Sequence, residues 1–256
     1  MNTTYWITHF RRNLQNRAEP PWDAPVTLTP SLVRQVLPSL EQFQLGDGGG
    51  PASLIAWNAE RFRGSSAHIR ELVDLWFAEE KEHSRLLSHA VRRFGGKLIK
   101  GHWSFTAFCA CRRVFGVRFE LQVLLLTEIV STAYYRVLRR HIDDVAVKAM
   151  CSLILRDEAG HVAFHRARLA PRRELTTGPG GLLWQLQFWI CGYAAATMLW
   201  TNHRFCLEAI GGSRTEYYNE VRFEIARFLR RLTRDSAAAS TAVEVPLTAP
   251  ALTQRV

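Results

Sequence analysis

The 256-residue chain has few cysteines, few lysines and no long uninterrupted apolar run. Five cysteines are an odd number for a chain of this size, which argues against a disulfide scaffold and indicates buried free thiols in a reducing compartment. The 16 glycines follow no three-residue period, which excludes a collagen-like chain. No apolar leader segment opens the sequence, and Leu182–Trp200 is too interrupted by polar residues to predict a membrane span. We therefore expect a cytoplasmic protein without a spanning segment.

Alternation of apolar and polar residues with a period of two is also missing, so the sequence predicts an all-α fold. Prolines between positions 20 and 30 predict an irregular lead-in over residues 1–30. Helical spacing of apolar residues begins at Ser31, is interrupted by glycines and Pro51 in 46–51, and resumes beyond them until a turn at 64–66. It then predicts helices over about 66–93, 103–115, 117–140, 145–169, 182–210 and 214–233. Residues 31–170 are expected to form one bundle, 171–234 additional helices on that bundle, and 235–256 a disordered tail.

The charge is strongly basic, with 33 Lys and Arg against 23 acidic residues and a formal net charge of +10 at pH 7. Nearly all of the excess is arginine, and the arginines occur as pairs dispersed near predicted helix ends, where cations interact favourably with the helix dipole. They form no continuous basic stripe, so we expect no nucleic-acid partner. An acidic partner, such as a carrier protein or a redox protein, would be compatible with this charge.

Two Glu-x-x-His motifs carry the clearest chemical signal. They are Glu80 with His83 and Glu158 with His161, each on a long predicted helix. Residues three apart lie on one side of a helix, so that a carboxylate and an imidazole can reach the same metal ion. A third acid, Glu128, also lies on an apolar helix face. Three carboxylates on core-facing stripes would each cost several kcal/mol unless paired or metal-bound, which favours metal ligation over three separate salt bridges.

The spacing of these acids along the chain supports the same site. Two antiparallel helices place residues equidistant from their turn at the same height, and the midpoint between Glu128 and Glu158 falls in the predicted turn at 142–144. Reflection of Glu80 through the turn at 64–66 makes Asp47 the nearest acid. The order acid, turn, Glu-x-x-His thus occurs twice, which is typical of a four-helix bundle with a dinuclear carboxylate site.

These motifs resemble the ferritin-like di-iron carboxylate superfamily. The segment AEEKEHSRLL (78–87) is similar to the first metal-binding helix of acyl-carrier-protein desaturases and related bacterial ferritin-like proteins, and RDEAGHVAFH (156–165) is similar to the second. The resemblance covers about residues 31–170. It implies two iron ions, or manganese and iron, held by Asp47, Glu80, His83, Glu128, Glu158 and His161. It further implies that Asp157 and Glu79 orient the ligating imidazoles.

One position departs from the family, because Asp47 stands where such proteins usually carry Glu, inside a glycine-rich run that disfavours a helix. Near Glu128, Tyr135 is a candidate for a role beside the metals, with simple packing as the alternative.

Three functions remain open from the sequence. The first is an O2-activating oxidoreductase, with Glu80, Glu128 and Glu158 as the catalytic carboxylates. It would act on an apolar small molecule or a carrier-bound substrate and would take electrons from a separate donor. A homodimer is a possible oligomeric state. The others are a ferroxidase and a non-catalytic helical scaffold with a degenerate site.

Overall fold

The computed structural model describes residues 1–15, 17–48, 66–113 and 116–243, and these residues form helices and connecting segments without a strand. The long helices are α2 (Pro30–Gly48), α3 (Ala67–Arg93), α5 (Val117–His141) and α6 (Val145–Leu169). Around them lie α1 (Thr3–Gln15), α4 (Trp103–Arg113), the short 3₁₀ helix η2 (Arg173–Leu175), α7 (Gly178–Ala209) and α8 (Arg214–Val243). The all-α prediction is confirmed.

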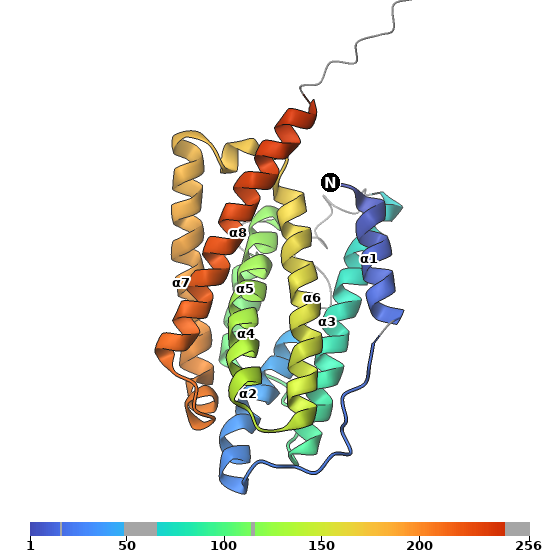
Figure 1. The fold of residues 1–256 in the computed structure, drawn as a ribbon, viewed down its shortest axis with the longest axis vertical. Coiled ribbons are helices and arrows are strands. Elements are labelled where there is room, and N and C mark those ends of the chain that lie inside the picture. Colours follow the sequence, from blue (N-terminus) through green and yellow to red (C-terminus); the bar gives the residue numbers. More distant parts are fainter. Residues whose placement is uncertain (16, 49–65, 114–115, 244–256) are drawn as a thin grey trace, which may run out of the picture.

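The helices pack in a connected arrangement around α5. Helix α2 packs on α3, α5 on α6, and α3 on α6, while α7 and α8 cover α5 from the other side. Figure 1 shows α1 at one edge of the molecule against α3, and α7 with α8 at the opposite edge. Among the described helices, α5 has the length and hydropathy of a membrane span, but 67% of its most apolar window is buried by neighbouring helices, as in a core helix.

The turn between α5 and α6 is fixed by Asp144. Its carboxylate accepts a hydrogen bond from the backbone N–H of Val147 at 3.1 Å and so caps α6, as an N-cap aspartate does. The same carboxylate lies 2.9 Å from the Arg93 guanidinium at the end of α3. This ion pair joins the α5–α6 hairpin to α3 and sets the relative height of the helices that carry the Glu-x-x-His motifs.

The N-terminal residues differ from the expected irregular lead-in, because α1 is helical. Trp6, Ile7 and Phe10 follow helical spacing and are buried. Trp6 and Phe10 contact Phe164 of α6 edge to face, with ring centroids 5.5 and 5.8 Å apart. The prolines begin only at position 20, so they end the helical segment without preventing it.

Two further boundaries differ from the sequence expectation. Helix α2 continues through Gly46 and Asp47 to Gly48, although glycine disfavours helix interiors, and the expected helix and turn between 49 and 65 fall outside the described residues. At the other end, α8 extends to Val243, beyond the expected end at 233. Ser236 is buried and bonds Thr176 at 3.1 Å, which ties this extension to the segment before α7. Residues 235–243, the first part of the expected disordered tail, are therefore helical, and 244–256 lie outside the described residues.

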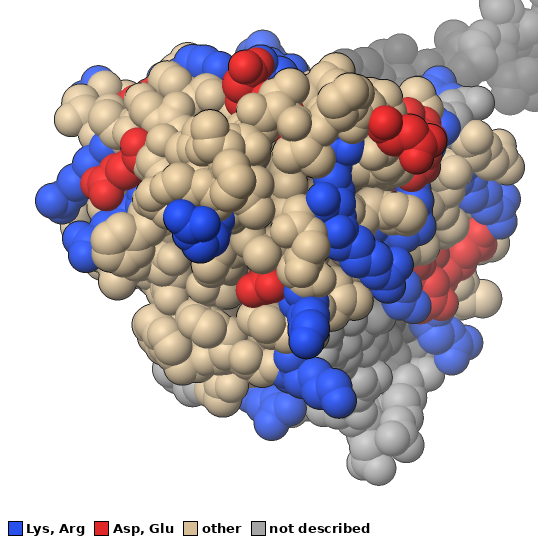
Figure 2. All heavy atoms as spheres, turned by 90° about the horizontal axis from the view of Figure 1, so that it is seen from below, with Lys and Arg blue, Asp and Glu red and all other residues tan. Residues whose placement is uncertain are grey.

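At one end of the molecule, basic side chains lie in separate groups. Figure 2 shows one end of the molecule, where Lys and Arg are interrupted by uncharged and acidic residues. Several arginines are ion-paired in the interior or at helix contacts, among them Arg93 with Asp144 and Arg112 with Glu120, the latter at 2.9 Å.

Candidate metal centre

The two Glu-x-x-His motifs face each other across α3 and α6. Helix α3 presents Glu80 and His83, and α6 presents Glu158 and His161 one turn apart on the inward side. Glu128 approaches the same space from α5. Both imidazoles are fully buried, Glu128 and Glu158 are nearly so, and Glu80 is partly buried. The sequence periodicity thus places five potential ligands from three helices around one point.

These five side chains form two ligand groups that share Glu80. Glu80, Glu128 and His161 make one group, and Glu80, His83 and Glu158 make the other, with the candidate ligand atoms of each group within 4.8 Å of one another. The two oxygens of Glu80 face different imidazoles, since Oε1 lies 3.1 Å from Nδ1 of His161 and Oε2 lies 3.5 Å from Nδ1 of His83. A carboxylate in this position can bridge two metal ions.

Several atoms of this cluster that could bind a metal have no hydrogen-bond partner among the described residues. These buried atoms are Nδ1 of His83 and His161, both carboxylate oxygens of Glu128, and Oε2 of Glu158. Buried polar atoms are almost always satisfied, and an orphaned one costs about 1–3 kcal/mol. Several of them converging on one point fit the oxygen and nitrogen donor set that iron or manganese takes.

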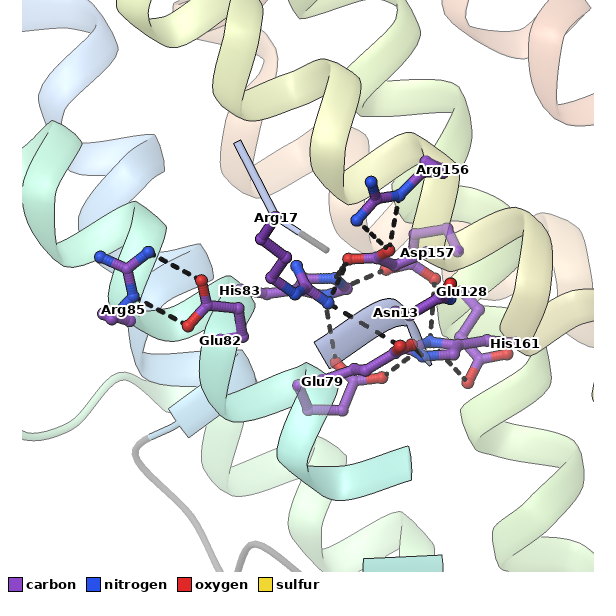
Figure 3. A network of polar contacts seen from close by, with 12 residues as sticks. Asn13, Arg17, Glu79, Glu82, His83, Arg85, Glu128, Arg156, Asp157 and His161 are labelled. Carbon is purple, nitrogen blue, oxygen red and sulfur yellow. Dashed lines mark hydrogen bonds and ion pairs between the residues drawn. The ribbon is translucent and has the colours of Figure 1, made fainter. Parts of the chain in front are cut away.

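The opposite edge of each imidazole is held by a carboxylate from the facing helix. Nε2 of His161 donates to Oε2 of Glu79 at 2.9 Å, and Nε2 of His83 donates to Oδ2 of Asp157 at 3.2 Å. Figure 3 shows both pairs. Glu79 and Asp157 each directly precede the first residue of a Glu-x-x-His motif, so each helix holds the histidine of the other. A carboxylate on the far ring nitrogen fixes the ring and directs Nδ1 to the cluster.

Arg17 joins these two outer carboxylates. Its guanidinium lies 2.7 Å from Asp157 and 3.8 Å from Glu79, and its side chain is 9% exposed (Figure 3). Arg156 adds a contact of 3.2 Å to the other oxygen of Asp157. No motif pointed to Arg17, because it lies in the segment after α1, and its role depends on contacts with residues far away in the sequence.

Interactions inside the cluster raise the pKa values of its two imidazoles and lower the pKa of Glu80. Burial lowers the pKa of His83, but Asp157 and Glu80 outweigh it and raise that pKa to about 10. Burial likewise opposes the charged form of His161, whose pKa Glu80 and its other acidic neighbours raise well above the usual range. Burial alone would raise the pKa of Glu80, but the two imidazoles lower it well below its ordinary value. Without a metal, protons on the imidazoles therefore balance the charge of Glu80.

The pKa values of the remaining carboxylates are raised, whereas that of Glu80 is lowered. Burial raises the pKa of Glu128 well above its ordinary value, and burial followed by repulsion from Glu80 does the same to Asp47. The pKa of Glu158 is raised mainly by burial. Clustered buried carboxylates of this kind are a frequent property of functional sites.

Asp47 and Tyr135 border the cluster without belonging to either ligand group. Asp47, near the end of α2, lines the same cavity as Glu80, Glu128 and Glu158 and interacts electrostatically with them, but it is absent from the two groups of close ligand atoms. The Tyr135 hydroxyl is buried without a hydrogen-bond partner among the described residues. Burial raises its pKa well above the usual range, with the neighbouring Asp47 as the next cause.

His165 also lies at the cluster, although the sequence favoured an ordinary core or surface histidine. It is fully buried, and its Nε2 is 3.4 Å from Oε2 of Glu128. Burial and the nearby Arg168 lower its pKa well below the usual value, so the ring is neutral. Its position one turn after His161 was the signal for this placement.

A largely apolar cavity of about 580 Å³ opens from the carboxylates. Its walls come from α2, α3, α4, α5, α6 and α7, and they include Glu80, Glu128 and Glu158 together with aromatic residues such as Phe105, Phe108 and Phe119. The volume lies within the range of small-molecule sites in proteins.

Comparison of the chain with protein-family models, with curated proteins and with solved structures finds no match.

Proposed function

We propose that the protein is a ferritin-like di-iron oxidoreductase, with manganese and iron as a variant of the metal pair, that uses O2 to oxidise an apolar substrate held in the adjoining cavity. The observation that carries this proposal is the position of Glu80 between two imidazoles, within two ligand groups that share it. Glu128 and His161 would complete one metal position, and His83 and Glu158 the other. When bound, the two metals would supply the electrons that reduce O2.

The protein side chains contribute positioning and a low-polarity environment. Glu79 and Asp157 hold the Nε2–H groups of the two imidazoles, so that the Nδ1 lone pairs are directed at the metal positions. Trp76 and Phe77 of α3 and Leu124 of α5 line the cavity beside the carboxylates and exclude water there. Electrons for repeated turnover would come from a separate donor protein.

The cavity favours substrate oxidation over simple iron oxidation. A ferroxidase needs a path for hydrated Fe²⁺, for which charged or polar walls are suited, whereas aromatic and aliphatic side chains dominate this cavity. The two buried carboxylate oxygens of Glu128 likewise argue against a scaffold with a degenerate site, since neither has a hydrogen-bond partner among the described residues.

Oxygen consumption by the iron-loaded protein tests this function. Metal-free protein would be loaded with Fe²⁺ under anaerobic conditions and then mixed with O2 in an oxygen electrode. We expect O2 consumption that stops after the bound iron is oxidised and resumes when a chemical reductant is added. Glu82→Gln, on the outer side of α3 where Glu82 binds Arg85 at 2.7 Å, is the matched control for Glu80→Gln.

The alternatives predict different results in that experiment. Continued oxidation of a large excess of Fe²⁺, with a ferric mineral as product, would assign a ferroxidase. Oxygen consumption that is equal in the wild type and in Glu80→Gln would contradict a role for the centre.

A further inference from the structure

A second polar cluster lies on the cavity wall, apart from the carboxylates. His203 of α7 lines the cavity, and its Nδ1 lies 2.8 Å from Oγ of Ser39 on α2. Oγ of Ser39 in turn lies 2.6 Å from the hydroxyl of Tyr134, which is 3.6 Å from Sγ of Cys206. All four side chains are buried, His203 with 8% of its surface exposed. The proposed oxidation does not use this chain of hydrogen bonds.

The chain leaves one atom of His203 for a ligand. Phe43 and Tyr134 pack on the ring, with centroids 4.6 and 5.4 Å away, and Ser39 occupies Nδ1. Nε2 has no hydrogen-bond partner among the described residues. Burial lowers the pKa of His203 to about 3, so the ring is neutral and carries one donor and one acceptor nitrogen. It can bond an uncharged polar group but offers no positive charge to an anion.

The rest of the cavity has the same neutral character. Away from the carboxylates of the centre, Arg112 is the charged side chain among the described lining residues, and it is ion-paired with Glu120. Two further buried polar atoms on the walls, Oε1 of Gln42 and Nε2 of Gln122, have no hydrogen-bond partner among the described residues. Both belong to uncharged amides.

The cavity is also elongated. Its wall on α5 runs from Phe119 to Ser131, which at about 1.5 Å per residue corresponds to about 18 Å along the helix. Glu128 lies near one end of this stretch. A ligand that fills the cavity therefore extends from the carboxylates along α5 instead of stacking compactly over them.

We propose that this cavity binds an elongated, uncharged and mainly apolar molecule that carries a hydroxyl or carbonyl group, and that Nε2 of His203 bonds this group and fixes the position of the molecule. The claim that the bound molecule is oxidised rests on the proposed function. The claim that it binds does not, because His203 and the apolar walls are independent of the metal ligands.

Ligand binding to the full-length chain, with and without metal, tests the proposal. Nile red, a neutral apolar dye, would report occupancy of the cavity by its fluorescence, and decan-1-ol, decanoate and decylammonium would be compared as competitors. We expect decan-1-ol to displace the dye and the two ions to bind more than about tenfold more weakly, because burial of an unpaired charge is unfavourable. The result should be the same after removal of metal by a chelator, so it is separable from the test of the centre.

Variants of His203 test the proposed contact. In His203→Phe, decan-1-ol should bind about five- to tenfold more weakly, which corresponds to loss of one neutral hydrogen bond. His203→Gln, which keeps a neutral donor and acceptor, should recover most of that loss. His89→Phe is the control, because the His89 ring stacks on Trp22 outside the cavity. Circular dichroism would establish that each variant is folded. Tighter binding of either ion, unchanged alcohol affinity in folded His203→Phe, or no dye binding would overturn the proposal.

Discussion

Glu79 accepts a hydrogen bond at 2.9 Å from Nε2 of His161, across the space between α3 and α6. Asp157 holds His83 in the reverse direction, so the two helices are joined by a reciprocal pair of carboxylate–imidazole contacts. A carboxylate only accepts hydrogen bonds, so the imidazole must donate from Nε2 and is left with Nδ1 for a metal. The two outer carboxylates therefore determine which nitrogen of each imidazole faces the cluster.

Removal of either outer carboxylate should weaken metal binding. We expect Glu79→Ala and Asp157→Ala each to lower the affinity for Fe²⁺ or Mn²⁺ by about 10- to 100-fold, because the imidazole loses its orientation and part of its basicity. Competition against a chelating dye would measure the affinity. Glu82→Ala on the same helix should leave it unchanged, because Glu82 is engaged with Arg85 away from the centre. Equal effects of Glu79→Ala and Glu82→Ala would contradict this role.

Arg17 should stabilise the fold through the outer carboxylates. In Arg17→Met, Asp157 and Glu79 lose their shared cation but keep Arg156 and the two imidazoles, so we expect the free energy of unfolding to fall by about 1–3 kcal/mol. Urea denaturation would measure the loss. The additional change Asp157→Asn should recover part of it.

The exposed Arg11, which pairs with Glu71, provides the matched comparison, since its side chain is 60% exposed. Arg11→Met should cost less than about 1 kcal/mol. A similar loss of stability in both arginine variants would show that the buried Arg17 stabilises the fold no more than the exposed Arg11 does.

Metal uptake should release protons. The raised pKa values of His83, at about 10, and of His161 keep both imidazoles protonated at pH 7 in the metal-free protein. A metal ion binds only the deprotonated nitrogen, so affinity should increase as the pH rises from 6 towards 10, with about two protons displaced from the histidines per chain. Titration calorimetry in buffers of different ionisation enthalpy would count them. Uptake without proton release at pH 7 would contradict the protonated state.

His203 should make the protein acid-sensitive. Its pKa of about 3 in the folded protein lies below the ordinary histidine value of 6.5, so the unfolded chain binds the extra proton between these values. Stability is then highest above pH 6.5 and is lost as the pH falls towards 3, by roughly 1.4 kcal/mol per pH unit. Urea denaturation as a function of pH should show a smaller slope for His203→Gln. The exposed His68→Gln should match the wild type, and an unchanged slope in His203→Gln would refute the assignment.

The helices and the cluster were predictable because they depend on local periodicity. The spacing of Glu80 to His83 and of Glu158 to His161 places each pair on one helix face, and the turn at 142–144 sets Glu128 opposite Glu158. The glycines near Asp47 predicted a break there, yet the helix continues through this residue. Packing of α2 on α3 is a tertiary contact that outweighs the low helix propensity of glycine.

Other features depend on contacts that no local pattern contains. Helix α1 buries Trp6 and Phe10 against α6, more than 150 residues later in the sequence. Arg17 contacts Asp157 and Glu79 only because the fold brings these two carboxylates together beside it. His203 lines the cavity because α7 packs on α2, where Ser39 binds its ring. Sequence periodicity gives the buried face of each helix but not which helix will cover it.

The metal content of the purified chain and of its Glu80 variant shows whether the two ligand groups each bind an ion. Metal-free protein would be loaded with Fe²⁺ or Mn²⁺ and separated from free metal. Its metal content would then be measured by inductively coupled plasma mass spectrometry. We expect about two ions per chain, one for each ligand group that shares Glu80. Glu80→Gln should weaken both positions, whereas Glu128→Gln and Glu158→Gln should each weaken one. A wild-type chain that binds no metal, or a Glu80→Gln chain that retains two ions with wild-type affinity, would contradict a dinuclear centre bridged by Glu80.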